Sequence, residues 1–285
     1  MNLTGLLPEL VTAIKAKKEI SAVEERWIGE RVLFFIEKRK EIAKKIEETR
    51  SFAQFSRSKE YEFLLKAVRA DLHAVYGTFQ QQLAARAKAF DELKKTYRDY
   101  HVDTEAHKKI LSTHTSTKER LPFYPSLYKH LFAHTGMPAT LLDVSCGLNP
   151  FSYPWMESTP KYIATEITID DCRMIREYFV LAGIKGEVIQ LDVINEKEKL
   201  STLKADVCLL WKLLDTLEYL ERNVSRRILP LVNASHLIVS FSTKTLSGKR
   251  MKKTRRLWFE KICEDNGWEI TIEEFGNELF YVVTK

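Results

Sequence analysis

The sequence predicts an α/β fold preceded by an all-α domain. Three observations lead to this prediction. Apolar residues recur at helical spacing through the first third of the chain, no β-rich run occurs before residue 139, and seven short β-rich runs follow residue 121. The 285 residues, 45% of them apolar, suffice for two domains with separate cores. We expect a helical domain over residues 1–112 and an α/β domain over residues 113–285.

The first third of the chain is expected to be helical throughout. Apolar side chains return every three or four positions in residues 6–14, 27–46, 61–72 and 79–93. Glu and Lys, which favour helices and form i,i+4 pairs, occupy most positions between them. Gly77 is expected to end the third of these stretches.

The remainder of the chain alternates strands with helices. Helical patterns over 170–182 and 217–232 lie between β-rich runs, which predicts a parallel sheet covered on both faces. The last two runs are separated only by a turn at Gly276 and should form an antiparallel hairpin at the sheet edge. Seven strands with a reversed final pair are typical of the Rossmann-like sheet of class I methyltransferases, more than of a dehydrogenase. The runs are 140–144, 161–166, 187–191, 206–210, 236–241, 269–272 and 279–284.

Composition excludes several classes of protein. Aromatic residues make up 11% of the chain, with only 10 Gly and 8 Pro, which argues against disorder and collagen-like repeats. No apolar stretch approaches the roughly 18 residues of a membrane span, and the N-terminus does not have the pattern of a secretory signal. The four cysteines form no C-x-x-C pair, so the spacing favours neither a zinc site nor a disulfide scaffold. We expect a cytoplasmic protein without a bound metal.

Positive charge is concentrated in two places. Residues 1–112 hold 22 Lys and Arg against 17 Asp and Glu, so they carry +5 of the net charge of +6. Residues 244–256 (KTLSGKRMKKTRR), called here the basic segment, hold seven basic residues and no acid. Such patches suit a polyanion, although a solvated surface loop is an equally simple interpretation of the basic segment.

The first β-rich run ends in the sequence LLDVSCGLNP (residues 141–150). Asp143 closes the strand, and Gly147 falls in the turn toward the next helix, where a ligand approaches the main chain closely at the switch point of such a sheet. Any α/β protein needs a tight turn here, which is the structural alternative. A full G-x-G-x-x-G is absent, so a dinucleotide site is poorly supported.

Acids follow the next two runs. Glu166 ends the second run about 20 residues after Gly147, where a carboxylate accepts both ribose hydroxyls of an adenosine ligand. Asp192 and Val193 follow the third run, where an acid can accept from an adenine amino group while the neighbouring main chain contacts the ring. An exposed acid at a strand end is the structural alternative for each. The order and spacing together predict adenosine binding.

The fourth run leads into Trp211–Lys212–Leu213–Leu214–Asp215, without the Asn/Asp-Pro-Pro-aromatic motif of many exocyclic-amine methyltransferases. Guanine N7 already has an in-plane lone pair, so methylation there needs positioning rather than a general base. We therefore assign no catalytic residue. Trp211 and Phe241 lie at strand ends, where they either stack on a flipped base or simply end the core.

Five collinear motifs between residue 114 and the C-terminus resemble one family. It comprises the aminoglycoside-resistance 16S rRNA guanine-N7 methyltransferases of the Arm/Rmt group. S-T-K-E-R together with C-G-L-N-P is the most specific pair, whereas the N-terminal part resembles the family only in helical character and length. The motifs are HTSTKER (114–120), DVSCGLNP (143–150), KLLDTLE (212–218), VSFSTKTLSGK (239–249) and NELFYVVTK (277–285).

The resemblance implies S-adenosyl-L-methionine as methyl donor and a guanine of the decoding site, position 1405, as target. Arg120 would hold the methionine carboxylate with Ser116 and Gly147 nearby, and Glu166 would bind the ribose. The adenine would lie against Asp192 and Val193, and the methionine side against Lys212 and Leu213. The expected donor-binding residues are Ser116, Arg120, Asp143, Gly147, Glu166, Asp192, Val193, Lys212 and Leu213.

The resemblance also implies a surface for the target RNA. The partner would be 16S rRNA in the assembled small ribosomal subunit, contacted by the helical domain and by the region around the basic segment, with a monomer as the default state. Specificity would come from the folded subunit, because a base must be flipped out and its phosphates bound. The residues expected to face the RNA are Trp211, Phe241, Lys244, Lys249, Arg250, Lys252 and Lys253.

Three positions depart from the family pattern. Asp215 and Ser242 replace prolines that often follow K-L-L and V-S-F, and Glu166 stands where Asp is more frequent. Two other functions stay open on the sequence. One is N7 methylation of a different rRNA guanine by a divergent relative, and the other is a catalytically silent RNA-binding or ribosome-assembly protein. His114 and its neighbours can also form only a helix cap, with Glu119 closing a capping box from Ser116.

Overall fold

We analysed a computed structural model of the chain, which describes all residues except 1–2, 18–19, 21–22, 73–82, 99–102 and 246–247. The chain forms two compact units, Met1–Gln81 and Gln82–Lys285. Each unit has buried apolar residues of its own. No helix among the described residues is long and apolar enough to cross a membrane.

The elements of the first unit are helices throughout its described residues. Their apolar faces meet in a core that includes Leu10, Ile28, Val32 and Leu64, all inaccessible to solvent. α2 packs against both α1 and α5, and the α2–α5 pair contains an ion pair between Arg31 and Asp71. Gly77, expected to end α5, lies outside the described residues. The helices are α1 (Leu3–Lys15), α2 (Glu25–Lys38), α3 (Lys40–Glu48), α4 (Phe52–Phe55) and α5 (Lys59–Leu72).

Four helices of the second unit precede its sheet. They are α6 (Leu83–Arg98), α7 (Thr104–Leu111), α8 (Thr115–Arg120) and α9 (Tyr124–Thr135). α6 packs on α7 and on α10 (Ile169–Ala182), and α7 packs on η3 (Asn149–Trp155), so Leu93 and Ile110 belong to the core beneath the sheet. The change in sequence texture at residue 112 is therefore not where the chain divides in space. Helices between residues 82 and 112 are part of the sheet unit because their apolar faces are buried against it.

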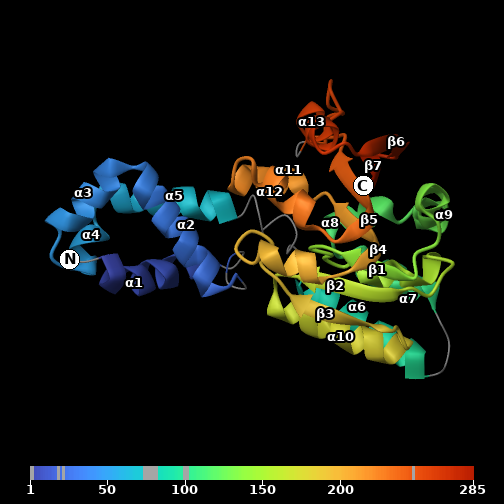
Figure 1. The fold of residues 1–285 in the computed structure, drawn as a ribbon. Coiled ribbons are helices and arrows are strands. Elements are labelled where there is room, and N and C mark those ends of the chain that lie inside the picture. The colour runs from blue at the N-terminus through green and yellow to red at the C-terminus, as the bar shows by residue number, and fades with distance from the viewer. Residues whose placement is uncertain (1–2, 18–19, 21–22, 73–82, 99–102, 246–247) are drawn as a thin grey trace. The chain divides into compact units, whose positions relative to one another are not determined.

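All seven predicted strands are present, in one sheet of order β3-β2-β1-β4-β5-β7-β6 (Figure 1). The first five are parallel, and the last two form the expected antiparallel hairpin, with β7 paired to β5 and β6 at the edge. The α/β class and the Rossmann-like arrangement are thus confirmed. The strands are β1 (Thr140–Asp143), β2 (Lys161–Glu166), β3 (Gly186–Gln190), β4 (Ala205–Trp211), β5 (Ala234–Ser242), β6 (Glu269–Phe275) and β7 (Glu278–Thr284).

The helical pattern predicted over 217–232 is three short elements rather than one helix. Asn223 has a left-handed backbone with φ of 61°, which interrupts the helix, and Pro230 has no N–H for continued α-helical bonding. The elements are α11 (Leu214–Leu220), α12 (Val224–Ile228) and η5 (Leu229–Leu231). The other segments between strands are η3 (Asn149–Trp155), α10 (Ile169–Ala182), η4 (Lys197–Thr202) and α13 (Leu257–Asp265).

The sheet separates two apolar layers (Figure 1). One layer packs residues of α6, α7, α9 and α10 against one face, and the other packs α11, α12 and α13 against the opposite face. Adjacent strand residues alternate between the layers, as Leu141 and Leu142 do in β1. A sheet buried on both faces leaves its carboxyl edge as the place where polar side chains can gather.

Candidate active site

Polar residues predicted to bind a ligand collect at the carboxyl edge of the sheet. Asp143 and Glu166 end β1 and β2, while Asp192 and Lys212 follow β3 and β4. The chain builds outward from β1 to β2 and β3, then returns to β4 on the other side of β1. The strand order therefore reverses between β1 and β4, which is the switch point where open α/β sheets bind ligands.

The loop after β1 is held in a tight turn. Ser145 and Gly147 both have left-handed backbones, with φ of 53° and 52°. The backbone N–H groups of Ser145 and Cys146 donate to the side chain and carbonyl of Thr165 in β2, at 3.1 and 2.9 Å. A Cβ on residue 147 would lie 3.3 Å from the ring of His114, so glycine suits this position in both conformation and space.

Glu166 joins this loop to the start of the next helix. Its carboxylate accepts hydrogen bonds from the backbone N–H of Gly147 at 3.0 Å, Ile167 at 2.8 Å and Thr168 at 3.3 Å. Burial raises its pKa to about 7, and nearby Asp171 acts in the same direction, against the three N–H donors. Carboxylate oxygens have about four acceptor positions between them, so about one position remains for a ribose hydroxyl.

Asp143 faces into the protein rather than toward the loop surface. Its Oδ2 accepts from Asn149 Nδ2 at 2.9 Å and from Tyr162 OH at 2.6 Å, and burial raises its pKa to about 6. Asn149 Oδ1 in turn accepts from Tyr124 OH at 3.0 Å. The carboxylate therefore anchors the turn between β1 and η3, and any effect on a donor would act through that turn.

Arg120 has a partner that we did not predict. At the end of α8, it donates from Nε and Nη2 to the Glu278 carboxylate at the start of β7, with distances of 2.8 to 3.1 Å. Both side chains are at most 5% exposed. Burial alone would raise the pKa of Glu278, but Arg120 and Lys212 outweigh it and lower that pKa. The Arg120 guanidinium also lies over the Trp211 ring, at 4.6 Å from its centroid.

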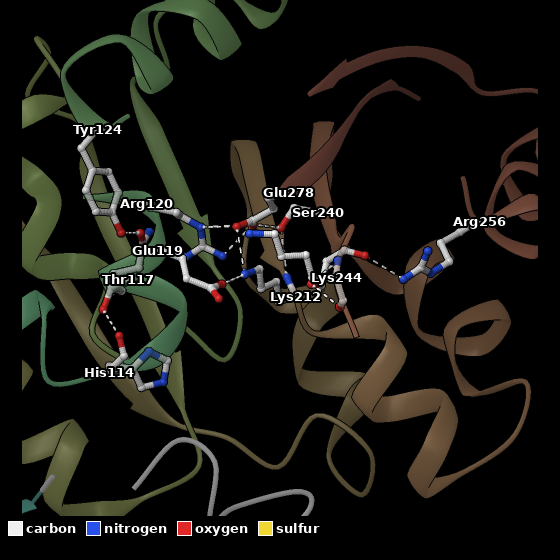
Figure 2. Close-up of polar contacts among 12 residues, drawn as sticks. His114, Thr117, Glu119, Arg120, Tyr124, Lys212, Ser240, Lys244, Arg256 and Glu278 are labelled. Carbon is white, nitrogen blue, oxygen red and sulfur yellow. Dashed lines mark hydrogen bonds and ion pairs between the residues drawn. The ribbon is translucent and has the colours of Figure 1, made fainter. Parts of the chain in front are cut away.

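Lys212 completes a largely buried cluster of four charges, called here the charge cluster: Glu119, Arg120, Lys212 and Glu278 (Figure 2). Its Nζ contacts Glu119 and lies 3.4 Å from Glu278. Its backbone is left-handed, with φ of 53°, and its N–H donates to both the carbonyl and Oγ of Ser240 at 3.0 Å. The cluster has two cations and two anions, so formally it is neutral.

The helix-cap alternative for residues 114–120 is wrong. α8 begins after His114, which makes no side-chain cap bond, and Glu119 pairs with Lys212 instead of closing a box from Ser116. Ser116 is buried on α8. Burial lowers the pKa of His114 to about 3, so this ring is neutral where it packs against Gly147.

Asp192 is used largely by its own turn. Its carboxylate accepts from the backbone N–H of Ile194 and Asn195 at 3.0 and 3.1 Å, and from the Asn195 amide at 2.6 Å. Val193 is buried beside it, and Leu213 is buried after β4. These residues stand at the predicted strand ends, with Asp192 fixing the shape of the turn.

The two aromatic residues assigned to base stacking are core residues in this structure. Phe241 has no exposed surface and packs against Trp258, Phe259 and Tyr281. Trp211 is 7% exposed, and its ring lies stacked on Tyr128 with centroids 5.6 Å apart. A base stacks only on an accessible ring face, so the alternative interpretation, the end of the core, is correct for Phe241 and describes Trp211 in this conformation.

The basic segment contains two kinds of cation. Arg250 pairs with Glu274 in β6, and Arg255 pairs with Glu260 in α13. Within the described chain, the four lysines are exposed and no carboxylate lies within ion-pair distance of them. They are Lys244, Lys249, Lys252 and Lys253.

With this geometry established, comparison with known proteins identifies the family. The family model described as "Ribosomal RNA methyltransferase (FmrO)" matches residues 38–282. The chain belongs to this family. The resemblance seen in the motifs from residue 114 onward is thereby confirmed, and the match reaches well into the helical first unit.

Curated proteins similar to this chain carry the name 16S rRNA (guanine(1405)-N(7))-methyltransferase. One from Micromonospora echinospora is 33% identical over 231 residues, covering 78% of this chain and 82% of its own length. Another from Proteus mirabilis is 28% identical over 240 residues, covering 78% and 84%.

Solved structures show the same fold. The 16S rRNA methyltransferase RmtF, crystallised with S-adenosyl-L-homocysteine, is 25% identical with a TM-score of 0.79, covering 100% of this chain and 99% of its own. The 16S rRNA methylase ArmA is 26% identical with a TM-score of 0.54, covering 68% and 97%. The match with RmtF extends over the whole of this chain, its sheet included.

Two members of the charge cluster, Glu119 and Glu278, were not predicted from the sequence. Glu278 lies in a motif that carries only the resemblance to the family, and the sequence offers Glu119 no role except in a helix cap. A signal for Glu278 was available, because it directly precedes an unbroken run of five apolar or aromatic residues, 279–283, all of them buried. An acid at the start of a buried strand needs a buried cation.

Proposed function

We propose that this protein is an S-adenosyl-L-methionine-dependent methyltransferase that modifies 16S rRNA at guanine N7 of position 1405 and thereby confers aminoglycoside resistance. One observation carries the proposal: the family match spans residues 38–282, and the residues of its motifs meet at the switch point of the sheet. Named relatives at up to 33% identity support the target.

The residues at the carboxyl edge fit the donor. Gly147 is a close-approach glycine with a left-handed backbone, Glu166 retains acceptor capacity beside it, and Arg120 supplies a fixed cation for a carboxylate. S-adenosyl-L-methionine supplies an electrophilic methyl group on a sulfonium. In the proposed arrangement Arg120, with Ser116, Lys212 and Leu213, holds the methionine portion. Glu166 holds the ribose, and the Asp192–Val193 turn contacts the adenine.

The proposed chemistry needs no proton transfer from the protein. Guanine N7 attacks with its own lone pair, so the site has to align the guanine with the methyl group and keep other nucleophiles away from it. The described acids at the edge agree with this requirement. Asp143 and Asp192 are bound to groups of their own chain, and Glu119 and Glu278 pair with cations. We therefore propose that the rate enhancement comes from positioning of the two reactants.

The proposed RNA surface consists of the four exposed lysines of the basic segment, Lys244, Lys249, Lys252 and Lys253, together with Arg250. Residues 1–112, which carry +5, are proposed as the helical RNA-docking region and residues 113–285 as the region that carries the methyltransferase motifs, with residues 82–112 folded against the sheet as part of the second unit. We also propose the assembled small subunit as the substrate, a cytoplasmic location and a monomeric enzyme. Lysines that contact phosphates release counterions, so binding should weaken steeply with salt.

A second target remains a specific alternative. Asp215 and Ser242 depart from the family pattern and both contact Arg256, next to the proposed RNA surface. A changed surface there favours a different rRNA guanine more than it favours a silent protein, because residues that fit the donor are present at the carboxyl edge of the sheet.

The deciding experiment incubates purified small subunits with the protein and S-adenosyl-L-methionine, cleaves the rRNA chemically at N7-methylguanine and maps the ends by primer extension. We expect a donor-dependent stop at position 1405. A stop at another guanine reassigns the target. If S-adenosyl-L-homocysteine binds in calorimetry but no stop appears, the protein is a silent RNA-binding protein. If neither binding nor a stop is observed, S-adenosyl-L-methionine is excluded as the ligand as well.

A further inference from the structure

Arg256, the last residue of the basic segment, differs from the other cations there because it is 9% exposed. Its Nε lies 3.2 Å from both oxygens of Asp215, and its Nη2 donates to Asp215 Oδ2 at 2.8 Å. Asp215 belongs to the first turn of α11, directly after β4. The contact therefore joins the basic segment to the strand end that carries Lys212.

The same guanidinium reaches both ends of the turn that the basic segment makes after β5. Nη2 donates to the Ser242 carbonyl at 3.1 Å and lies 3.8 Å from Met251 Sδ, while Nη1 donates to the Thr254 carbonyl at 2.7 Å. Its own backbone N–H donates to Tyr281 OH at 2.9 Å. The Arg256 side chain thus contacts the start of the turn at Ser242, its end at Thr254, and α11 at Asp215.

Between these points the chain doubles back on itself. Lys244 and Arg250 form an isolated antiparallel bridge, and Met251 N–H donates to the Thr243 carbonyl at 2.8 Å. Ser242 Oγ donates to the Lys244 carbonyl at 2.9 Å and accepts from its N–H at 3.2 Å. The lysines at positions 244, 249, 252 and 253 are carried on or just after this folded-back turn.

Asp215 and Ser242 meet at this guanidinium, the first through its carboxylate and the second through its carbonyl. The Ser242 hydroxyl also bonds the backbone of Lys244. These two residues and Arg256 are therefore parts of one local arrangement.

We propose that the Asp215–Arg256 ion pair is a positioning device, which fixes the turn of the basic segment so that its lysines meet the target RNA in register with the methyl donor. The inference rests on the proposed function for its RNA partner. Arg256 itself acts through the turn, because its guanidinium is occupied by protein acceptors. A bidentate pair on a mostly buried arginine is more strongly oriented than the exposed pairs beside it.

The charge of Asp215 gives the test a definite sign. Asp215→Asn removes an acid from a surface proposed to face phosphates, so electrostatics alone would strengthen subunit binding. Loss of the positioning device instead weakens it. We expect the KM for small subunits to rise about fivefold, with kcat and the Kd for S-adenosyl-L-homocysteine unchanged. An unchanged or lower KM overturns the proposal.

Asp265→Asn is the matched control. Asp265 also forms an ion pair with an arginine, Arg226, at 2.7 Å, and its replacement changes the net charge equally. It lies at the far end of α13 from Arg256. The KM for subunits in this variant should stay at the wild-type value, and an equal rise in both variants would also overturn the proposal.

A second measurement tests, without relying on catalysis, whether the Asp215–Arg256 ion pair holds the turn. Amide hydrogen exchange at residues 243–245 and 248–251 should be about fivefold faster in Asp215→Asn than in wild type or Asp265→Asn. Equal exchange in all three proteins shows that the pair does not hold the turn. If wild-type protein binds the donor but no subunits, the proposed function is contradicted. The exchange rates still show in that case whether the Asp215–Arg256 ion pair holds the turn.

Discussion

Arg120 and Glu278, 158 positions apart in the sequence, form a two-pronged ion pair in which both side chains are withdrawn from solvent. The pair joins α8, which carries the motif S-T-K-E-R, to the first residue of β7. A planar guanidinium held through Nε and Nη2 has its orientation fixed before any ligand arrives. In the proposed donor site, affinity for the donor and stability of the fold are therefore linked at this pair.

Replacing one member of the pair should destabilise the fold strongly. Glu278→Gln leaves the Arg120 charge buried without its main anion, which costs about 3–5 kcal/mol. Urea denaturation followed by circular dichroism measures this loss. Glu274→Gln, which breaks the exposed pair with Arg250, is the matched control and should cost at most about 1 kcal/mol. Equal losses would mean that burial does not set the cost.

Removing Arg120 should abolish tight donor binding. Arg120→Ala combined with Glu278→Gln avoids leaving a buried carboxylate unpaired, so a folded protein can be titrated with S-adenosyl-L-homocysteine by calorimetry. Loss of a charge-assisted hydrogen bond to the ligand carboxylate should raise Kd at least about tenfold, equivalent to about 1.4 kcal/mol. Glu278→Gln alone is the reference. Unchanged affinity in the double variant would remove Arg120 from the donor site.

Donor binding should weaken as the solution becomes acidic. The pKa of Glu166 is raised to about 7, so its carboxylate takes up a proton as pH falls through that value and no longer accepts ribose hydroxyls as an anion. We expect the Kd for S-adenosyl-L-homocysteine to rise about tenfold between pH 8 and pH 6. Glu166→Gln should bind weakly with a flat profile. A wild-type profile that is equally flat would contradict the ribose assignment.

Burial of Asp143 should lower the stability of the protein as pH rises from about 4 to about 6. Its folded-state pKa of about 6 lies above the unfolded value, so at this site the folded state holds a proton that the unfolded state has lost. Buried His107 and His114, whose pKa values are lowered to about 4 and about 3, act in the opposite sense, so the contribution of Asp143 is measured as a difference. Thermal unfolding of wild type and Asp143→Asn across this range gives that difference. The Tm of the variant relative to wild type should rise with pH, and a constant difference would contradict the expectation.

Gly147→Ala should impair the donor loop beyond its conformational cost. Alanine with a φ of 52° is strained, and its Cβ would also lie 3.3 Å from the His114 ring. Gly267→Ala provides the comparison, since its φ is 70° and no atom lies within 4 Å of the added Cβ. Both variants should lose about 1 kcal/mol of stability, but only Gly147→Ala should weaken S-adenosyl-L-homocysteine binding in calorimetry. Equal affinities would place the loop away from the donor.

The exposed lysines should contribute to RNA binding additively. Lys252→Gln with Lys253→Gln should make the slope of log K against log salt shallower by about 0.7–0.9 for each phosphate that is no longer neutralised. Lys261→Gln, in an α13 lysine paired with Glu264 and Asp265, should leave the slope unchanged. Filter binding to small subunits measures the slopes, and identical slopes in all proteins would exclude phosphate binding by these lysines.

The sequence allowed the sheet to be predicted well because its signals are local. β-rich runs bounded by turns placed all seven strands within three residues of their observed ends, and Gly276 marked the final hairpin. Strand ends also located Glu166 and Lys212 at the edge, because parallel strands present their carboxyl ends together.

Partners across the fold were beyond the reach of local signals. Nothing near Arg120 indicates that Glu278 will meet it, and the acids that pair with Arg250 and Arg256 lie in other elements. The prediction that aromatic residues at strand ends stack on a base was wrong for Phe241 for a related reason. A strand end predicts where Phe241 lies along the sheet, but burial beneath α13 depends on packing that no single segment encodes.

The helices that precede the sheet have a practical consequence for dissecting the protein. A fragment cut at residue 113 would lose Phe90, Leu93 and Ile110 and would leave the face beneath the sheet open to water. Such a fragment should aggregate even though it contains all five motifs. A fragment that starts at residue 82 keeps that layer whole, so the minimal unit for grafting or recombination with other proteins is longer than the motifs suggest.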